Sequence, residues 1–307
     1  MTAYLESLAV LCAIAAILAS SLDLVLGFAG IFSVAHAVFF GIGAYAASLV
    51  ALHLTASLAF ALAVAMAAGA GAGLLLAVPA LRVREEYFVV ASLGFQVVAT
   101  TVFEQWQAVT GGIGGLTGIP PPTVAGLKVE SYAGMAALSV LLAGAVLAGL
   151  RALVRSRLGR ALQALNQDEV AAQAAGHNPV TLRTLAVVVS CSLASVGGVI
   201  YAFFSSFVNP ESFTLDESVR VMVMVIMGGA GTTAGPLLGA LFVTLFPALL
   251  SFLTIPDQFL GPIQRLAYGL IVVVLMVYEP DGMVGLARRL RRLRALAPAG
   301  KPGESTA

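Results

Sequence analysis

Apolar residues run through the chain in long blocks that short polar stretches separate. A membrane-crossing helix needs about 20 apolar residues. Blocks near that length predict spans at Leu5–Leu26, Val34–Leu52, Ser57–Ala80, Tyr87–Gln107, Tyr132–Val154, Leu182–Phe207, Val219–Leu253 and Ile263–Tyr278. The pattern therefore predicts an all-α fold, a polytopic bundle of membrane helices.

One long polar run, Arg155–Pro179, lies between these blocks in the middle of the chain. Its first part has apolar residues at the spacing of one helix face. These residues are Leu158, Ala161, Leu162 and Leu165. This half of the run predicts an amphipathic helix beside the membrane.

The second part of the run is rich in alanine and predicts a short, narrow helix from Asp168 to Ala175. Asp168 and Glu169 lie where a helix N-terminus favours negative charge. Gly176 is placed to end the helix in a left-handed conformation, and Pro179 prevents its continuation. Such a helix suits docking into a groove on a partner. The alternative is an ordinary amphipathic connection.

Positive side chains mark the cytoplasmic side of a membrane protein. They gather in one short loop, around the polar run and after the last block, at Arg82, Arg84, Arg151, Arg155, Arg157, Arg160, Arg183, Arg288, Arg289, Arg291, Arg292 and Arg294. Lys128 is the only lysine or arginine in the loops Val109–Ser131 and Val208–Ser218. We expect these two loops, and the N-terminus, to face the outside.

This orientation constrains the block Val219–Leu253, because a single crossing there would leave the last span pointing the wrong way. Its first part, Val219–Met227, would be only about 14 Å of helix, too short to cross. Glycines follow at Gly228–Gly235, in the sequence GGAGTTAG. The block is therefore expected to enter the membrane as a half-helix, break, and return.

A second glycine-rich break, GFAGIFS, occurs at Gly27–Ser33. Irregular backbone at membrane depth is tolerated only where protein or a water-lined cavity shields it. Two interrupted segments in the two halves of the chain suggest a duplicated architecture around a central path. For any single glycine, close helix packing is the alternative role.

The chain has 60% hydrophobic and 10% charged residues, whereas soluble proteins have about 25% charged residues. A net charge of +1 gives no reason to expect a nucleic-acid partner. Cys12 and Cys191 lie in apolar runs and are expected to be buried small side chains. Residues 1–290 are expected to form one transmembrane domain and residues 291–307 a polar, disordered tail.

Few ionisable residues lie well inside the predicted spans, and each is costly in lipid. Asp23 is expected to pair with a backbone amide near the Gly27 break. His36 is expected either to bond across helices or to line a path, and Glu104 to reach solvent. The chain has no metal-binding spacing, no catalytic Ser/His/Asp arrangement and no phosphate-binding loop with lysine. We therefore expect neither an enzyme nor a cofactor.

Six motifs follow one another along the chain. They are GFAGIFSVAHAVFFGIGAY from Gly27, TGGIGGLTGIP from Thr110, the EAA…G pattern at Glu169, Ala171, Ala172 and Gly176, VNPESF from Val208, GGAGTTAGPLLGA from Gly228 and EPDGMVGL from Glu279. In this order they resemble the M-type inner-membrane permeases of branched-chain amino-acid ABC importers, the hydrophobic amino acid uptake family. Each motif alone is weak, because most of it is glycine. Together they extend over nearly the whole chain.

This resemblance implies that the short cytoplasmic helix couples the permease to a separate ATPase. The implied coupling residues are Arg160, Asp168, Glu169, Ala171, Ala172 and Gly176. The residues implied to line the translocation path are Gly27, Gly30, Ser33, His36, Phe40, Gly43, Gln96, Gly228, Gly229, Gly231, Thr232, Gly235 and Pro236. Free backbone groups at the two breaks are expected to meet a zwitterionic or small polar substrate.

The resemblance also implies partners in the bacterial inner membrane. These are a homologous second permease, two ATP-binding subunits and a periplasmic or lipid-anchored binding protein. The chain departs from the family at Ile31, where glutamine is frequent, at Val97, where an acid is frequent, and at Asn166–Glu169, where R-E-N-E is frequent. Other amino acids, urea or short amides are alternative substrates, and an ion-coupled carrier or an intramembrane enzyme are alternative classes.

Overall fold

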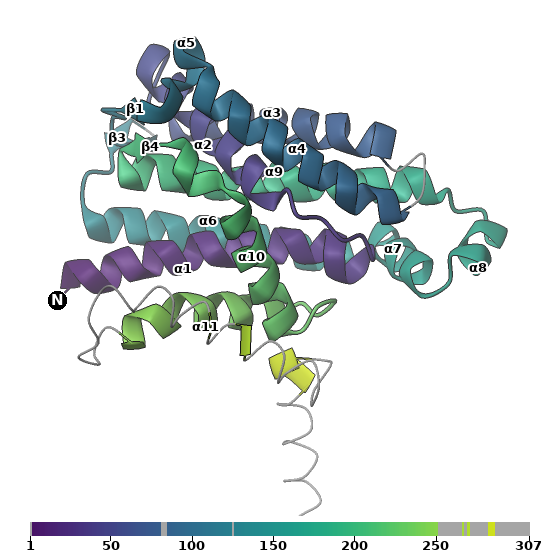
Figure 1. Ribbon diagram of the computed structural model, residues 1–307. Helices are drawn as coiled ribbons and strands as arrows, with labels where there is room; N and C mark the ends of the chain where they lie inside the picture. The colour runs from purple at the N-terminus through teal and green to yellow at the C-terminus, as the bar shows by residue number, and fades with distance from the viewer. Residues whose placement is uncertain are drawn as a thin grey trace, which may run out of the picture.

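The computed structural model describes residues 2–80, 85–124, 126–250, 266, 269–270 and 282–285. Long helices lie side by side in a bundle (Figure 1). Six of the described helical segments are long and apolar enough to cross a membrane. They are α1 (Thr2–Asp23) with its π-helical continuation η1 (Leu24–Phe28), α2 (His36–His53), α3 (Leu58–Ala80), α4 (Glu85–Gln105), α6 (Tyr132–Arg155) and α9 (Pro179–Ser205). The polytopic helical bundle predicted from the apolar blocks is confirmed.

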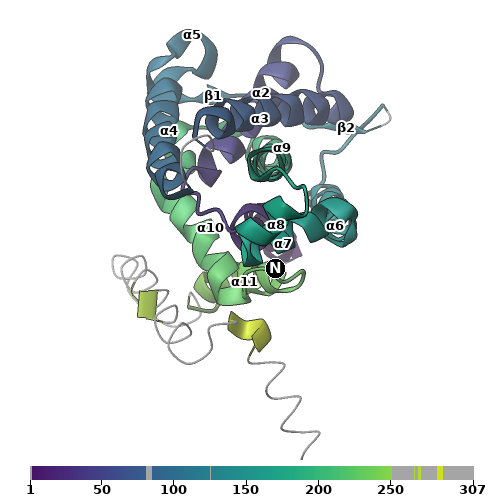
Figure 2. The same cartoon turned by 90° about the vertical axis from the view of Figure 1, so that its right-hand side faces the viewer.

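The centre of the bundle is formed by α1, α2 and α9, in which most residues of the apolar segment are buried. In α3, α4 and α6 only a minority of these residues are buried. Figure 2 looks along the helices and shows α9 near the centre. Small residues allow α2 and α9 to approach closely. A Cβ on Gly43 would lie 2.2 Å from the carbonyl oxygen of Ser195. This is the close helix packing that small residues permit in membranes.

The loops expected outside form a small cap at one end of the bundle. The cap contains α5 (Gln107–Thr110), η2 (Gly112–Gly114), β1 (Leu116–Thr117), β2 (Thr123–Val124), β3 (Leu127–Lys128), β4 (Phe207–Val208) and η3 (Pro210–Phe213). Strands β1 and β4 pair antiparallel, with Leu116 opposite Val208, so the two loops are joined. The N-terminus lies at this end (Figure 1).

The polar run forms two helices at the opposite end of the bundle, α7 (Arg157–Gln167) and α8 (Glu169–Ala174). The predicted amphipathic pattern of α7 is confirmed, because Ala161, Leu162 and Leu165 are buried and Leu158 packs against the core. Pro179, which was expected to prevent continuation of the alanine-rich helix, is the first residue of α9. Proline is well suited to this position, where its missing N–H has no helical partner.

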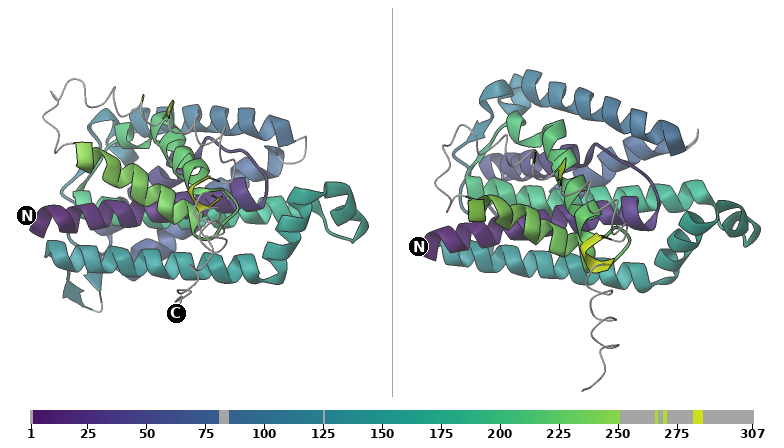
Figure 3. Two further views of the ribbon diagram at one scale, coloured as in Figure 1. Left: turned by 90° about the horizontal axis from the view of Figure 1, so that it is seen from below. Right: turned by 60° about the horizontal axis from the view of Figure 1, so that its bottom comes forward.

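The block after this cap is interrupted as predicted. Its two helices are α10 (Leu215–Gly228) and α11 (Gly235–Leu250), and the break lies between them. α10 would be about 21 Å long, shorter than the hydrocarbon core. Figure 3 shows α11 turning back toward the end that holds the N-terminus. α10 begins four residues earlier than expected, at Leu215, and its first turn carries Asp216 and Glu217. Acidic residues stabilise a helix N-terminus.

Several expectations fall outside the described residues. They concern Arg82 and Arg84, most of the predicted span Ile263–Tyr278, the arginines from Arg288 to Arg294 and the tail 291–307.

Candidate functional site

The short helix α8 has a defined start and a defined end. The Asp168 side chain accepts a hydrogen bond from the backbone N–H of Ala171 at 3.0 Å. At the other end, the N–H groups of Gly176 and His177 donate to Gln173 and Ala172. Gly176 has φ of +87°, the left-handed conformation expected for it. These are the bonds of a Schellman motif, which stabilises the C-terminus of a helix.

α8 projects from the end of the bundle (Figure 1). Ala171 is exposed, whereas Ala172 is buried against the protein. Val170, which was not among the predicted coupling residues, has an apolar side chain that is 78% exposed. Arg160 on α7 is also exposed, and its guanidinium donates to the carbonyl of Arg155 at 2.7 Å. The exposed surface of α8 thus consists of Val170, the small Ala171 and Ala174, and the polar Gln173.

Glu169 contacts two side chains of its own chain. Its Oε2 lies 3.1 Å from a guanidinium nitrogen of Arg183 on α9, and its Oε1 accepts from the Gln173 amide at 3.0 Å. Arg183 was expected only as a cytoplasmic charge. Its position one turn into a helix that follows the polar run is a signal that could have identified this pair.

The two helix breaks meet at the half-buried Gly27 and Gly231, beside the buried end of α1. Asp23, at the end of α1, is 2% exposed, and its Oδ1 accepts a hydrogen bond from the N–H of Gly231 at 2.8 Å. Asp23 thus pairs with an amide near the Gly27 break, as expected, and this amide belongs to the second break. The reason is spatial, since Gly231 lies against Gly27.

The polar run also reaches the first break. The side-chain amide of Asn166, near the end of α7, donates to the carbonyl of Gly27 at 3.2 Å. Within the second break, Thr232 Oγ1 accepts from the N–H of Gly235 and donates to the carbonyl of Gly229. Several backbone groups expected to meet a substrate are therefore already paired within the chain.

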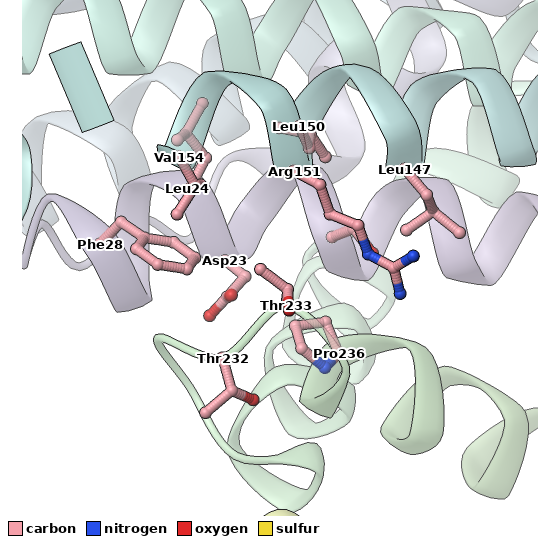
Figure 4. A pocket seen from close by; sticks show the side chains of 11 residues that line it. Asp23, Leu24, Phe28, Leu147, Leu150, Arg151, Val154, Thr232, Thr233 and Pro236 are labelled. Carbon is pink, nitrogen blue, oxygen red and sulfur yellow. The ribbon is translucent and has the colours of Figure 1, made fainter. Parts of the chain in front are cut away.

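A small cavity lies beside the second break (Figure 4). It is lined by Ser20, Asp23, Leu24, Phe28, Leu147, Leu150, Arg151, Val154, Thr232, Thr233 and Pro236. Figure 4 shows the Asp23 carboxylate facing the loop with Thr232 and Thr233, while Arg151 extends from α6 on the side of Pro236. A volume of about 20 Å³ accommodates one water molecule and no amino acid.

The remaining predicted path residues lie in a different group, around the start of α2. His36 Nε2 lies 2.9 Å from the hydroxyl of Ser21 on α1, which is the cross-helix bond we considered for it. Ser33 is buried. Phe40 packs edge-to-face against Tyr201 and Phe213. Gly43 lies in the α2–α9 contact, the packing role considered for glycines.

Gln96 holds three segments together at the same level. Its amide nitrogen donates to the carbonyl of Phe213 at 2.9 Å, and its oxygen accepts from the Ser218 hydroxyl at 3.1 Å. Ser218 in turn accepts from the N–H of Ala37 in the first turn of α2. Ser218 was expected only as the end of a loop, because nothing in its local sequence indicates a contact 122 residues away.

The candidate site residues thus form three groups: the exposed α8, the meeting point of the two breaks, and the start of α2. With this arrangement established, comparison with known proteins identifies the family. Residues 4–278 match the family model described as the branched-chain amino acid transport system permease component. The chain belongs to this permease family. The match contains both helix breaks and the α7–α8 segment.

Individual relatives of this permease chain are distant in sequence, and the two LivM proteins extend over most of it. The high-affinity branched-chain amino acid transport system permease protein LivM of Escherichia coli K12 is 28% identical over 93% of this chain and 71% of the relative. LivM of Salmonella typhimurium LT2 is 28% identical over 91% and 69%. LivH of Escherichia coli K12, a permease protein of the same named system, is 28% identical over 42% and 40%. No solved structure matches the chain.

Proposed function

We propose that this chain is the translocating permease of an ATP-driven importer for branched-chain amino acids. It works with a homologous second permease, two cytoplasmic ATP-binding subunits and an external substrate-binding protein. The ATP-binding subunits supply the hydrolysis, and α8 receives their motion. The membrane spans then open alternately to the two sides, around a path that the broken segments line.

The exposed face of α8 is the observation that carries this proposal. α8 is a narrow helix at one end of the membrane bundle. It exposes Val170, Ala171 and Ala174, and no other part of the described chain covers these three residues. An exposed apolar surface of this kind marks a contact with another protein. Similarity to both LivM and LivH supports a paired permease, since their names assign them to one transport system.

Cysteine crosslinking tests whether α8 docks on the ATP-binding subunit. In a chain without Cys12 and Cys191, Val170→Cys on α8 should crosslink to that subunit in the assembled importer. The matched control is Ile113→Cys, because Ile113 is 73% exposed but lies in η2 at the opposite end. Crosslinking of Ile113→Cys to the ATP-binding subunit, or equal labelling of both, contradicts the proposed docking.

Transport measurements test the energy source and the substrate. Leucine uptake should fail after ATP depletion and survive a proton uncoupler, whereas an ion-coupled carrier would show the reverse. Competition by excess isoleucine and valine, but not by urea or acetamide, would support the branched-chain substrate. Substrate binding by the purified external binding protein, measured by calorimetry, identifies the substrate independently of this chain.

A further inference from the structure

Four residues from distant parts of the chain meet at one point, which we call the polar junction: Asp23, Gly27, Asn166 and Gly231. Asn166 lies two residues before Asp168, the residue that caps α8. Gly27 belongs to the first break and Gly231 to the second. The two hydrogen bonds of the junction connect residues that are 139 and 208 positions apart.

The two glycines of the first break give the Asn166 side chain its place. The Asn166 amide nitrogen donates to the Gly27 carbonyl, and a Cβ on Gly30 would lie 2.3 Å from the Asn166 Oδ1. A side chain on Gly30 would therefore have to displace the Asn166 side chain from its present position. The Asn166 side chain is held against both glycines of the GFAG sequence, so a movement of the α7–α8 connection acts directly on the first break.

The same glycine brings the second break into contact. A Cβ on Gly27 would lie 2.1 Å from both the Asp23 Oδ1 and the Gly231 nitrogen. The Asp23–Gly231 hydrogen bond therefore lies directly against the Gly27 backbone. Asp23 is almost fully buried, and a hydrogen bond is electrostatically stronger in such surroundings than in water. The first and second breaks are thus held as a unit.

We propose that Asn166 and Asp23 are positioning residues that transmit the displacement of α8 to both helix breaks at once. The proposal rests on the proposed docking of α8 to the ATP-binding subunit. Asn166 moves with α8, pulls on the first break through Gly27, and Asp23 carries the second break along through Gly231. The small cavity beside Asp23 and Thr232 changes shape with this movement.

The test measures substrate imported per ATP hydrolysed by the complete importer in proteoliposomes. Asn166→Ala removes the bond to Gly27 and should lower this ratio about 5-fold or more, the range of ordinary coupling energies. Gln167→Ala is the matched control, because Gln167 is the neighbouring exposed residue at the end of the same helix. A normal ratio in Asn166→Ala, or an equal loss in both variants, overturns the proposal.

Asp23 tests the junction from the other side. Asp23→Asn keeps an oxygen that accepts from Gly231 and should retain most of the import per ATP, whereas Asp23→Leu should lose it. In one shared junction, adding Asn166→Ala to Asp23→Leu causes little further loss. Independent, multiplying losses contradict the proposal, as does identical behaviour of Asp23→Asn and Asp23→Leu.

Hydrogen–deuterium exchange separates this proposal from the proposed function and needs only the wild-type importer if a variant does not assemble. Binding of a non-hydrolysable ATP analogue should change exchange in α8, in residues 29–35 and in residues 229–234 together. No change in α8 contradicts the docking itself. A change in α8 without a change in both breaks contradicts only the polar junction.

Discussion

Glu169 on α8 and Arg183 on α9 form an ion pair, with 3.1 Å between the Glu169 Oε2 and a guanidinium nitrogen. The Glu169 side chain is 43% exposed and that of Arg183 only 10%. The acidic residue of the EAA sequence therefore fixes α8 to a membrane helix of its own chain. Under the proposed docking of α8, this ion pair with α9 would give the short helix a second route, besides Asn166, by which its movement reaches the bundle.

Charge reversal at this pair should uncouple transport, and restoring the pair should rescue it. Glu169→Lys places a cation beside Arg183, so import per ATP should fall. Loss of the pair should lower the free energy of local opening of α8 by about 1 kcal/mol, since solvent screens the exposed partner. The double variant Glu169→Lys, Arg183→Glu should recover part of both quantities, measured by transport and by hydrogen exchange.

Gln167→Lys is the control for added charge. It puts the same cation on the exposed end of α7, away from Arg183, and should leave import per ATP unchanged. If Glu169→Lys behaves like Gln167→Lys, then the ion pair has no part in coupling. If the double variant is no better than Glu169→Lys, Glu169 acts on another partner.

Gly176 should be sensitive to conformation and insensitive to size. Its φ is +87°, yet a Cβ at this position would meet nothing within 4 Å. Asparagine tolerates the left-handed conformation, whereas valine does not, at a cost of about 1–2 kcal/mol. Gly176→Asn should therefore retain transport and Gly176→Val should reduce it, as measured by leucine uptake at equal amounts of assembled importer.

The control for this pair is Gly71→Ala, because Gly71 also has open space around its Cβ position but lies within α3 and has no positive φ. It should leave uptake unchanged. Loss of uptake in Gly176→Asn equal to that in Gly176→Val would mean that a side chain of any kind blocks docking, and that backbone conformation is not the reason.

The sequence predicts the helices well because apolar length and helix ends are local signals. The interruption at Gly228–Gly235 follows from charge and length alone, and α10 and α11 are separated there. The ends of α8 are likewise encoded in Asp168 and Gly176, which cap the helix through nearby backbone groups. Local hydrogen bonds of this kind need no knowledge of the rest of the fold.

The contacts within the candidate site could not be predicted in the same way. Asn166 appears in the sequence as a departure from the family pattern, yet it donates to a carbonyl 139 residues away. Asp23 was expected to pair with an amide near the Gly27 break, but its local sequence could not say that this amide would be Gly231, 208 residues away. Which two distant segments meet depends on the packing of the bundle, which no single stretch of sequence specifies.

Gly43 offers a direct choice between helix packing and the translocation path. A Cβ there would lie 2.2 Å from the Ser195 carbonyl oxygen, so Gly43→Ala should force α2 and α9 apart and destabilise the chain by about 1–3 kcal/mol. Thermal unfolding of the purified importer should occur at a lower temperature. Gly94→Ala in α4 should not lower the unfolding temperature, because a Cβ on Gly94 would have no atom within 4 Å. A normal unfolding temperature in Gly43→Ala with an altered KM for leucine would instead favour a path-lining role.

Gln96 should act through the structure that it holds together. Gln96→Leu leaves the Phe213 carbonyl and the Ser218 hydroxyl without their partner in a buried site, and each unpaired group costs about 1–3 kcal/mol. The variant should therefore assemble poorly and unfold at a lower temperature, while the importer that does assemble keeps its KM for leucine. Gln107→Leu changes an exposed glutamine in the outer cap and should unfold like the wild type. Should Gln96→Leu assemble and unfold normally but discriminate differently between leucine and other amino acids, Gln96 would face the substrate, and the hydrogen bonds to Phe213 and Ser218 would have to open during transport.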